Sequence, residues 1–259
     1  MRRQRLGQHY LVDRLVVEKI ITSAAIRSDE RVLEIGTGRG VLTKELVRLG
    51  ASLEGFEIDR ENFAATLREL GTSRAVIHLE DAFKEVPRFD VLISSLPYSK
   101  SATFIEWISR VEYDRAVVII QEDFVGKIMA PPGARDYRAI SAVAQASSEF
   151  NVLMKVCRES FSPPPKVSSL LVLVKPKRRM MDGQISRVKQ LFSLRRREVV
   201  SAATELGMPL PSYDYGRRRV YSLTPKEVLE ICGKTEGQAN AGRSSRNDSG
   251  PKIRLWTTE

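Results

Sequence analysis

A glycine-rich turn between a short apolar segment and an amphipathic one is the strongest constraint on how this chain can fold. Residues 31–35 (Arg-Val-Leu-Glu-Ile) fit a β-strand, residues 36–40 (Gly-Thr-Gly-Arg-Gly) follow directly, and residues 41–49 have helical spacing up to Gly50. Glycines at such a turn let the backbone bend sharply and approach a ligand closely. The pattern predicts a nucleotide-binding βα unit, with an ordinary tight turn that holds no ligand as the alternative.

Strands and helices continue to alternate beyond this turn. Further strands are expected at residues 52–58, 75–79, 89–94 and 116–121. Further helices are expected at residues 13–26, 61–70, 101–108 and 137–146. Two late strands, 151–156 and 168–174, have no helix between them. The fold class is therefore predicted to be α/β: a Rossmann-like, doubly wound and mostly parallel sheet with an antiparallel hairpin at one edge.

A run of charged residues after the last expected strand marks a domain boundary. Residues 1–176 are expected to form the α/β domain, with an N-terminal helical lead-in. Residues 177–233 are expected to form a small, basic helical domain with helices at 184–206 and 224–231. Residues 234–259 are polar and rich in glycine, serine and asparagine, a composition that predicts a disordered tail.

The excess of positive charge is concentrated in one part of the chain. The whole sequence has 42 Lys and Arg against 32 Asp and Glu, a net charge of +10. Residues 51–150 hold 11 basic and 16 acidic side chains, whereas residues 151–220 hold 15 basic and five acidic ones. A local excess of this kind is typical either of a solvated basic surface or of a face that binds nucleic-acid phosphates.

Cysteine and histidine are too few and too scattered to indicate a metal site. The two cysteines are Cys157 and Cys232, the two histidines are His9 and His78, and none has the spacing of metal ligands. No signal peptide is recognisable, and no apolar run reaches the roughly 18 residues of a membrane span. The sequence therefore predicts a reduced, cytoplasmic protein without a metal ion or a membrane span.

Acidic residues end the second and third strands of the predicted sheet. Glu57 comes 21 residues after Gly36, the distance at which a carboxylate accepts the two ribose hydroxyls of a bound nucleotide. Asp81, which precedes Ala82, is placed to accept a hydrogen bond from an adenine amine. The alternatives are a solvated strand end for Glu57 and a helix cap for Asp81.

The fourth strand ends in the most informative tetrapeptide of the chain, Ser95-Leu96-Pro97-Tyr98. The Ser95 hydroxyl and a backbone carbonyl of Leu96 or Pro97 can accept hydrogen bonds from an amine and orient its lone pair toward a methyl donor. Tyr98 offers a flat face on which a base can stack. Since methyl transfer to an aromatic amine depends largely on positioning, these residues are candidates for the catalytic site. The alternative is a proline-containing turn without a catalytic role.

These motifs together resemble the ribosomal RNA adenine dimethyltransferases of the KsgA type, over about residues 5–233. The resemblance is carried by residues 6–11, 33–43, 57–59, 81–82, 95–98, 161–169, 192–197 and 217–223. It implies a methyltransferase sheet that binds S-adenosyl-L-methionine. It also implies transfer of four methyl groups to two adjacent adenosines near the 3′ end of small-subunit ribosomal RNA, on an immature small ribosomal subunit.

The resemblance also implies roles for individual residues. The expected cofactor contacts are His9, Leu11, Gly36, Gly38, Glu57, Asp81 and Ser95. The expected catalytic residues are Ser95, Leu96, Pro97, Tyr98 and Phe161, of which the two aromatic rings would sandwich a flipped adenine. The expected RNA contacts are Lys166, Arg195, Arg196, Arg197, Arg217, Arg218 and Arg219. A monomer is expected.

The chain departs from the family pattern at three polar positions. Ser95 and His9 stand where the family has asparagine, and Ser168 stands where it has aspartate. We expect an active enzyme in which the second methylation is slower or incomplete. Two alternatives are a catalytically weak or silent rRNA-binding assembly factor and a methyltransferase acting on large-subunit rRNA. A protein-glutamine methyltransferase is disfavoured, because it would carry Asn-Pro-Pro-Tyr and lack the basic C-terminal part.

Overall fold

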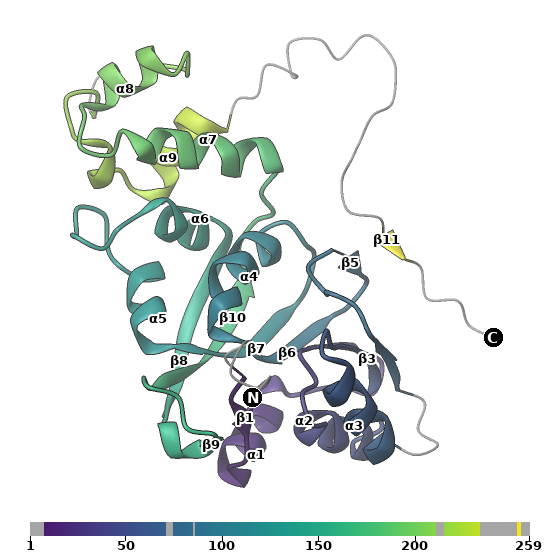
Figure 1. Ribbon diagram of the computed structural model, residues 1–259. Helices are drawn as coiled ribbons and strands as arrows, with labels where there is room; N and C mark the ends of the chain where they lie inside the picture. The colour runs from purple at the N-terminus through teal and green to yellow at the C-terminus, as the bar shows by residue number, and fades with distance from the viewer. Residues whose placement is uncertain (1–7, 71–74, 85, 211–214, 234–252, 255–259) are drawn as a thin grey trace, which may run out of the picture.

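The computed structural model, which describes residues 8–70, 75–84, 86–210, 215–233 and 253–254, is built around a seven-stranded sheet (Figure 1). The strand order is β4-β3-β2-β6-β7-β10-β8. The strands are β2 (Arg31–Ile35), β3 (Ser52–Phe56), β4 (Val76–His78), β6 (Val91–Ser95), β7 (Arg115–Gln121), β8 (Ser148–Val156) and β10 (Ser169–Pro176). Pairing is parallel from β4 to β7, and β10 is antiparallel to both of its neighbours. The predicted α/β fold with an antiparallel edge hairpin is confirmed.

Helices cover both faces of the sheet (Figure 1). They are α1 (Arg14–Ala24), α2 (Val41–Arg48), α3 (Arg60–Leu70), α4 (Ser101–Ile108), α5 (Glu122–Ile128) and α6 (Ala139–Ser147). Because side chains alternate along a strand, Val91 and Ile93 of β6 pack in the apolar cluster of α1 and α2, whereas Leu92 packs in the cluster of α4 and α6. Helix α5 was not predicted.

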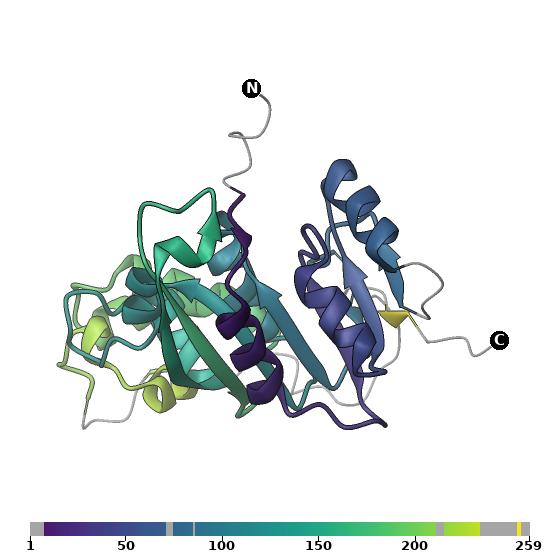
Figure 2. The same cartoon turned by 90° about the horizontal axis from the view of Figure 1, so that it is seen from below.

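The N-terminal segment forms a short second sheet at the carboxyl edge of the central one. Strand β1 (Tyr10–Leu11) pairs antiparallel with β9 (Phe161–Ser162), so residues distant in sequence lie side by side (Figure 2). Helix α1 follows at once, and the Asp13 carboxylate caps it by accepting the N–H groups of Leu15 and Val16. The beginning of the chain is thereby joined to the loop that carries Phe161.

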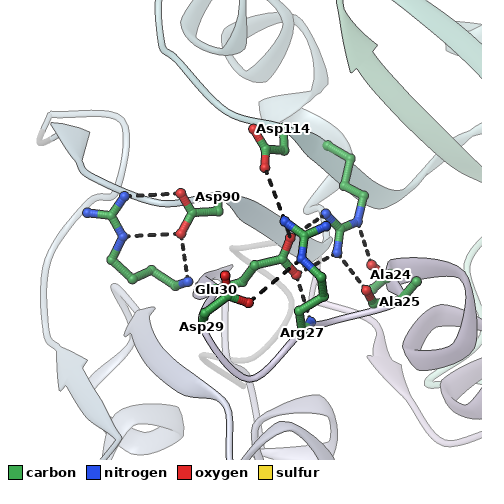
Figure 3. A network of polar contacts seen from close by, with 9 residues as sticks. Ala24, Ala25, Arg27, Asp29, Glu30, Asp90 and Asp114 are labelled. Atoms are coloured by element: carbon green, nitrogen blue, oxygen red, sulfur yellow. Dashed lines mark hydrogen bonds and ion pairs between the residues drawn. The ribbon is translucent and has the colours of Figure 1, made fainter.

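A polar cluster around Glu30 fastens the other end of α1 to the amino-terminal edge of the sheet (Figure 3). The Arg115 guanidinium donates to the carbonyls of Ala24 and Ala25, at 2.6 and 2.8 Å, and to both carboxyl oxygens of Glu30. Glu30 is only 2% exposed, and its hydrogen bonds with Arg115 hold its pKa below the usual range. This clamp fixes α1 along the sheet, with its start at the opposite, carboxyl edge.

The C-terminal part is helical, but the single helix predicted over 184–206 is wrong. Two helices occur instead, α7 (Asp182–Ser193) and α8 (Val199–Glu205). The chain leaves helical geometry between them because the N–H of Val199 donates to the carbonyl of Arg218 and not to the preceding helical turn. Helix α9 (Pro225–Cys232) lies where a helix was predicted, and Thr224 caps it by exchanging hydrogen bonds with Glu227.

The C-terminal helices pack on the sheet domain through one continuous apolar cluster. Ile185 and Val188 of α7 and Val228 of α9 belong to the same cluster as Phe104 of α4. Strand β10 ends at Pro176, where the sequence places a domain boundary, but the division into separate domains stays a prediction. Most of the predicted disordered tail, at 234–252 and 255–259, lies outside the described residues, and Ile253–Arg254 (β11) pair with Val86–Pro87 (β5).

Within the described ranges, no helix combines the length and apolar character needed to cross a membrane. The same residues contain no cluster of three or more side chains that could hold a metal ion.

Candidate active site

A cavity lies at the carboxyl ends of β2, β3 and β6, beneath the N-terminal segment. Every residue predicted to contact the cofactor or the target base lines it. The main lining residues are Gln8, His9, Leu11, Gly36, Gly38, Glu57, Asp81, Ser95, Leu96, Pro97, Tyr98, Lys100 and Phe161. Sequence-distant motifs therefore meet at one site, as expected for the strand ends of a doubly wound sheet.

The glycine-rich turn and the acid at the end of β3 form one hydrogen-bonded unit. Gly36 and Gly38 have φ angles of +77° and +57°, a conformation that side chains with a Cβ rarely adopt. The Gly38 N–H donates to Glu57 Oε2 at 2.8 Å, and the N–H groups of Ile58 and Asp59 donate to Glu57 Oε1 at 2.8 Å. Three donors thus fix the carboxylate: Oε1 accepts two of them, and Oε2, which accepts one, retains capacity for a hydroxyl.

Burial and hydrogen bonding have opposite effects on the pKa of Glu57. The side chain is 5% exposed, and this burial raises its pKa, although the N–H groups of Asp59, Gly38 and Ile58 act in the opposite direction. The acid is therefore held in place by its hydrogen bonds while it remains poorly hydrated. A solvated strand end, the alternative for this residue, does not match its burial.

A second carboxyl, Glu34 at the end of β2, lines the same cavity and was not predicted to have a role. Glu34 is 0% exposed, and neither of its oxygens has a hydrogen-bond partner of good geometry among the described residues. Burial raises its pKa to about 8, although groups of Thr43 oppose the shift. Its position just before the glycine turn was visible in the sequence, but its enclosure depends on the packing of α2.

Asp81 projects from the loop after β4 and is paired with an unpredicted lysine. Asp81 Oδ1 accepts the N–H of Phe83 at 3.1 Å, and Asp81 Oδ2 lies 3.4 Å from Lys100 Nζ. Residues 82–84 form a turn, so Asp81 caps no helix there. Lys100 stands two residues after the tetrapeptide of β6, and that closeness was the only sequence signal for it.

The tetrapeptide after β6 presents polar acceptors and an aromatic ring. The Ser95 hydroxyl makes no hydrogen bond to any residue in the described ranges. The Pro97 carbonyl accepts the N–H of Lys100 at 2.8 Å, in the 3₁₀ turn η2 (Tyr98–Lys100). This bond leaves the Leu96 carbonyl as the more available of the two predicted carbonyl acceptors.

Two contacts hold the side chain of Tyr98. Its hydroxyl lies 2.8 Å from the Ser169 hydroxyl of β10, and its ring centroid is 5.6 Å from that of His9. His9 in turn donates through Nδ1 to the carbonyl of Pro163 at 2.7 Å, with the nitrogen in its protonated tautomer. Burial raises the pKa of Tyr98, so the phenol stays neutral in the physiological range.

His9 and Ser168, the other two residues that differ from the family pattern, make different contacts. His9 is engaged with the loop that follows Phe161, and Phe161 itself is 3% exposed. Ser168 is held by its backbone, because its carbonyl accepts the N–H of Glu122 at 3.1 Å. A shorter side chain at position 168 therefore leaves this backbone tie intact.

The predicted RNA contacts divide into two groups. Arg195, Arg196 and Arg219 line a separate hollow together with Arg135, a set called here the arginine pocket. Within the described part of the chain, none of these four forms an ion pair with a carboxylate. The other residues lie outside the hollow: Arg197 pairs with Glu205, Arg218 pairs with Glu227, and Lys166 and Arg217 are exposed.

Comparison with known proteins gives a consistent family assignment. Residues 1–219 match the family model described as ribosomal RNA adenine dimethylase. The probable ribosomal RNA small subunit methyltransferase A of Pyrococcus abyssi is 35% identical over 240 residues, which cover 88% of this chain and 89% of that protein. The ribosomal RNA small subunit methyltransferase A of Thermotoga petrophila is 31% identical over 238 residues, covering 90% and 91%.

Solved structures agree with the fold. A dimethyladenosine transferase from Plasmodium falciparum superimposes with a TM-score of 0.73 at 26% identity, covering 86% of this chain and 95% of that one. The 23S rRNA methyltransferase ErmE superimposes with a TM-score of 0.60 at 22% identity, covering 86% and 98%, and shares the fold. On the family match and these identities, the chain belongs to the ribosomal RNA adenine dimethylase family.

Proposed function

We propose that this protein uses S-adenosyl-L-methionine to dimethylate the exocyclic amines of two adjacent adenosines near the 3′ end of small-subunit rRNA. The observation that carries the proposal is the single cavity in which Glu57 and Asp81 lie together with Ser95, Tyr98 and Phe161. The names of the relatives from Pyrococcus abyssi and Thermotoga petrophila support the small subunit as the source of the substrate.

The residues of the cavity fit the adenosine part of such a cofactor. The Glu57 carboxylate is oriented by three N–H groups and can accept a ribose hydroxyl at Oε2, which retains a free acceptor site. Asp81 can accept from the adenine amine, and Ile58 and Phe83 supply apolar surface on the same wall. When bound, S-adenosyl-L-methionine supplies an electrophilic methyl group on its sulfonium sulfur.

The remaining residues position the target base. A stacked and paired adenine cannot present its amine inside a cavity, so the base must leave the RNA helix. Tyr98 and Phe161 then hold its two faces, while the Ser95 hydroxyl and the Leu96 carbonyl accept hydrogen bonds from its amine. The two acceptors direct the nitrogen lone pair away from themselves, and this orientation supplies much of the rate enhancement.

The arginine pocket is the part of the surface best suited to RNA phosphates. Arg135, Arg196 and Arg219 lie at the rim of one hollow without carboxylate partners among the described residues, so their charges remain available for phosphates. Arg197 and Arg218 are neutralised in part by Glu205 and Glu227, which predicts a smaller contribution from them. Exposed Lys166 and Arg217 are further candidates for contacts with the rRNA of the immature subunit.

The proposal is tested by methylation of small ribosomal subunits from cells that lack this protein. The purified chain, incubated with S-adenosyl-L-methionine, should produce dimethyladenosine at two adjacent positions, located by mass spectrometry of rRNA fragments. The Tyr98→Ala variant is the control and should bind the cofactor without transferring methyl groups. Binding to subunits without transfer would favour a silent assembly factor, and modification of large-subunit rRNA would favour the second enzymatic alternative.

A further inference from the structure

The hydroxyl groups of Tyr98 and Ser169 are 2.8 Å apart, although the two residues are 71 positions apart in the sequence. Ser169 is 0% exposed and is the first residue of β10. It pairs with Gln121 of β7 on one side and with Val156 of β8 on the other. The serine is therefore held by strand pairing on both sides, which makes its hydroxyl a fixed point of the sheet.

The ring of Tyr98, in contrast, stands on a short backbone element. It begins the three-residue 3₁₀ turn η2, which follows Pro97 at the end of β6. Besides its hydroxyl contact, the side chain lies against the His9 ring, with the two ring centroids 5.6 Å apart. Stacking on a base needs only the aromatic ring, which a phenylalanine would also provide. The hydroxyl is thus not needed for stacking, and it is partnered by a buried serine from a different strand.

We propose that Ser169 is a positioning residue for methyl transfer, whose hydroxyl fixes the plane of the Tyr98 ring on which the target adenine stacks. This inference rests on the proposed role of Tyr98 in base stacking. The bond links the antiparallel edge of the sheet to the site of transfer. Loss of the bond allows the ring to turn about its side-chain torsions, so that fewer bound bases reach the geometry required for attack.

The size of the effect follows from the strength of one neutral hydrogen bond. A net contribution of about 0.5–1.5 kcal/mol corresponds to a rate change of about two- to tenfold. Because Ser169 is not among the residues that line the cavity, its removal should leave the affinity for S-adenosyl-L-methionine unchanged. The change should appear in the rate of transfer from the assembled complex.

The test measures single-turnover methylation of small ribosomal subunits by the full chain and five variants. Ser169→Ala and Tyr98→Phe should each slow transfer by about two- to tenfold, whereas Ser169→Thr, which keeps the hydroxyl, should be faster than Ser169→Ala. The double variant Ser169→Ala with Tyr98→Phe should be no slower than the slower single variant, because both changes remove the same bond. Ser168→Ala is the matched control and should transfer at the wild-type rate, since Ser168 is held through its backbone.

For each variant, calorimetric titration measures the affinity for S-adenosyl-L-methionine, and thermal unfolding shows whether the protein is folded. Unchanged cofactor affinity and a cooperative transition with slower transfer support the positioning role. A double variant whose loss equals the product of the two single losses would overturn it, as would a Ser169→Ala variant with the wild-type rate. A wild-type protein that methylates no small-subunit adenosine would instead overturn the proposed function.

Discussion

The Glu57 carboxylate accepts the backbone N–H of Gly38 at 2.8 Å, so the acid that ends β3 holds the turn that follows β2. Glu57 thus has two tasks in the proposed site: it would accept a ribose hydroxyl, and its bond to Gly38 helps to hold the glycine turn in its left-handed conformation. Both tasks concern the cofactor, and neither concerns the RNA. The structure therefore separates the effects that different substitutions should have.

Replacement of Glu57 should weaken cofactor binding much more than RNA binding. Glu57→Ala removes the acceptor of three N–H groups and of the expected ribose hydroxyl, so the dissociation constant for S-adenosyl-L-methionine should rise by at least about tenfold. Calorimetric titration measures this change, and filter binding of small subunits measures RNA affinity. Glu80→Ala, at an exposed residue of the same cavity, is the control. Equal losses of both affinities would contradict the ribose role.

Glu34 should make the folded protein less stable as the pH rises. Its pKa is raised by burial to about 8 from an ordinary value of 4.5, so the folded state holds a proton that the unfolded state has already lost. The stabilisation is complete below pH 4.5 and is lost progressively as the pH rises to about 8, at a slope of up to about 1.4 kcal/mol per pH unit.

Glu34→Gln removes this titration while it keeps the size of the side chain. Urea unfolding at several pH values should show that the variant gains stability relative to the wild type between pH 5 and 8. The comparison cancels the contributions of other carboxyls, such as Glu30 and Asp90, whose pKa values are lowered by Arg115 and Arg31. Parallel curves for the two proteins over this range would show that Glu34 is ionised in the folded state.

Position 95 should set the efficiency of the second methylation. An adenosine amine has two N–H groups before the first transfer and one afterwards, so the second step depends more on each remaining acceptor. Ser95 offers one short hydroxyl, whereas asparagine offers a longer amide carbonyl. Ser95→Asn should therefore give an equal or faster second methylation, seen as a higher ratio of dimethyladenosine to monomethyladenosine by mass spectrometry. A variant without activity would show that the serine itself is required.

The sequence predicted that Gly36, Glu57, Asp81 and Ser95 lie at one site, because each follows or ends a parallel strand and parallel strands present those ends at one edge. Asp13 as a helix cap and the Thr224–Glu227 box were also predictable, since capping is local. Helix α5 was missed because it follows β7 directly, without a glycine or proline to mark the change. The division of α7 from α8 depends on a hydrogen bond to distant Arg218, which no local pattern reveals.

The burial and pairing of side chains at the site also depend on contacts that a local sequence pattern does not show. Glu34 and Ser169 both lie in segments that carried motifs, but their burial results from the packing of α2 and from the pairing of β10. Arg195, Arg196 and Arg219 of the arginine pocket were predicted to contact RNA, whereas Arg135 was not. The division of the predicted RNA contacts into paired and unpaired arginines depends on Glu205 and Glu227, which lie eight and nine residues from their partners.

The arginine pocket should account for a measurable part of the salt dependence of RNA binding. A combined Arg135→Gln, Arg196→Gln and Arg219→Gln variant removes three cationic groups from one hollow. Each lost phosphate contact lowers the slope of log affinity against log salt concentration by about 0.7–0.9, so the slope should fall by about two to three. Arg197→Gln is the matched control, because the guanidinium of Arg197 is paired with Glu205. Its change in slope should be smaller than the change caused by replacing any single arginine of the pocket. An unchanged slope in the triple variant would place the RNA-binding face elsewhere. A change in the control equal to that of one pocket arginine would show that Arg197 contacts the RNA despite its ion pair with Glu205.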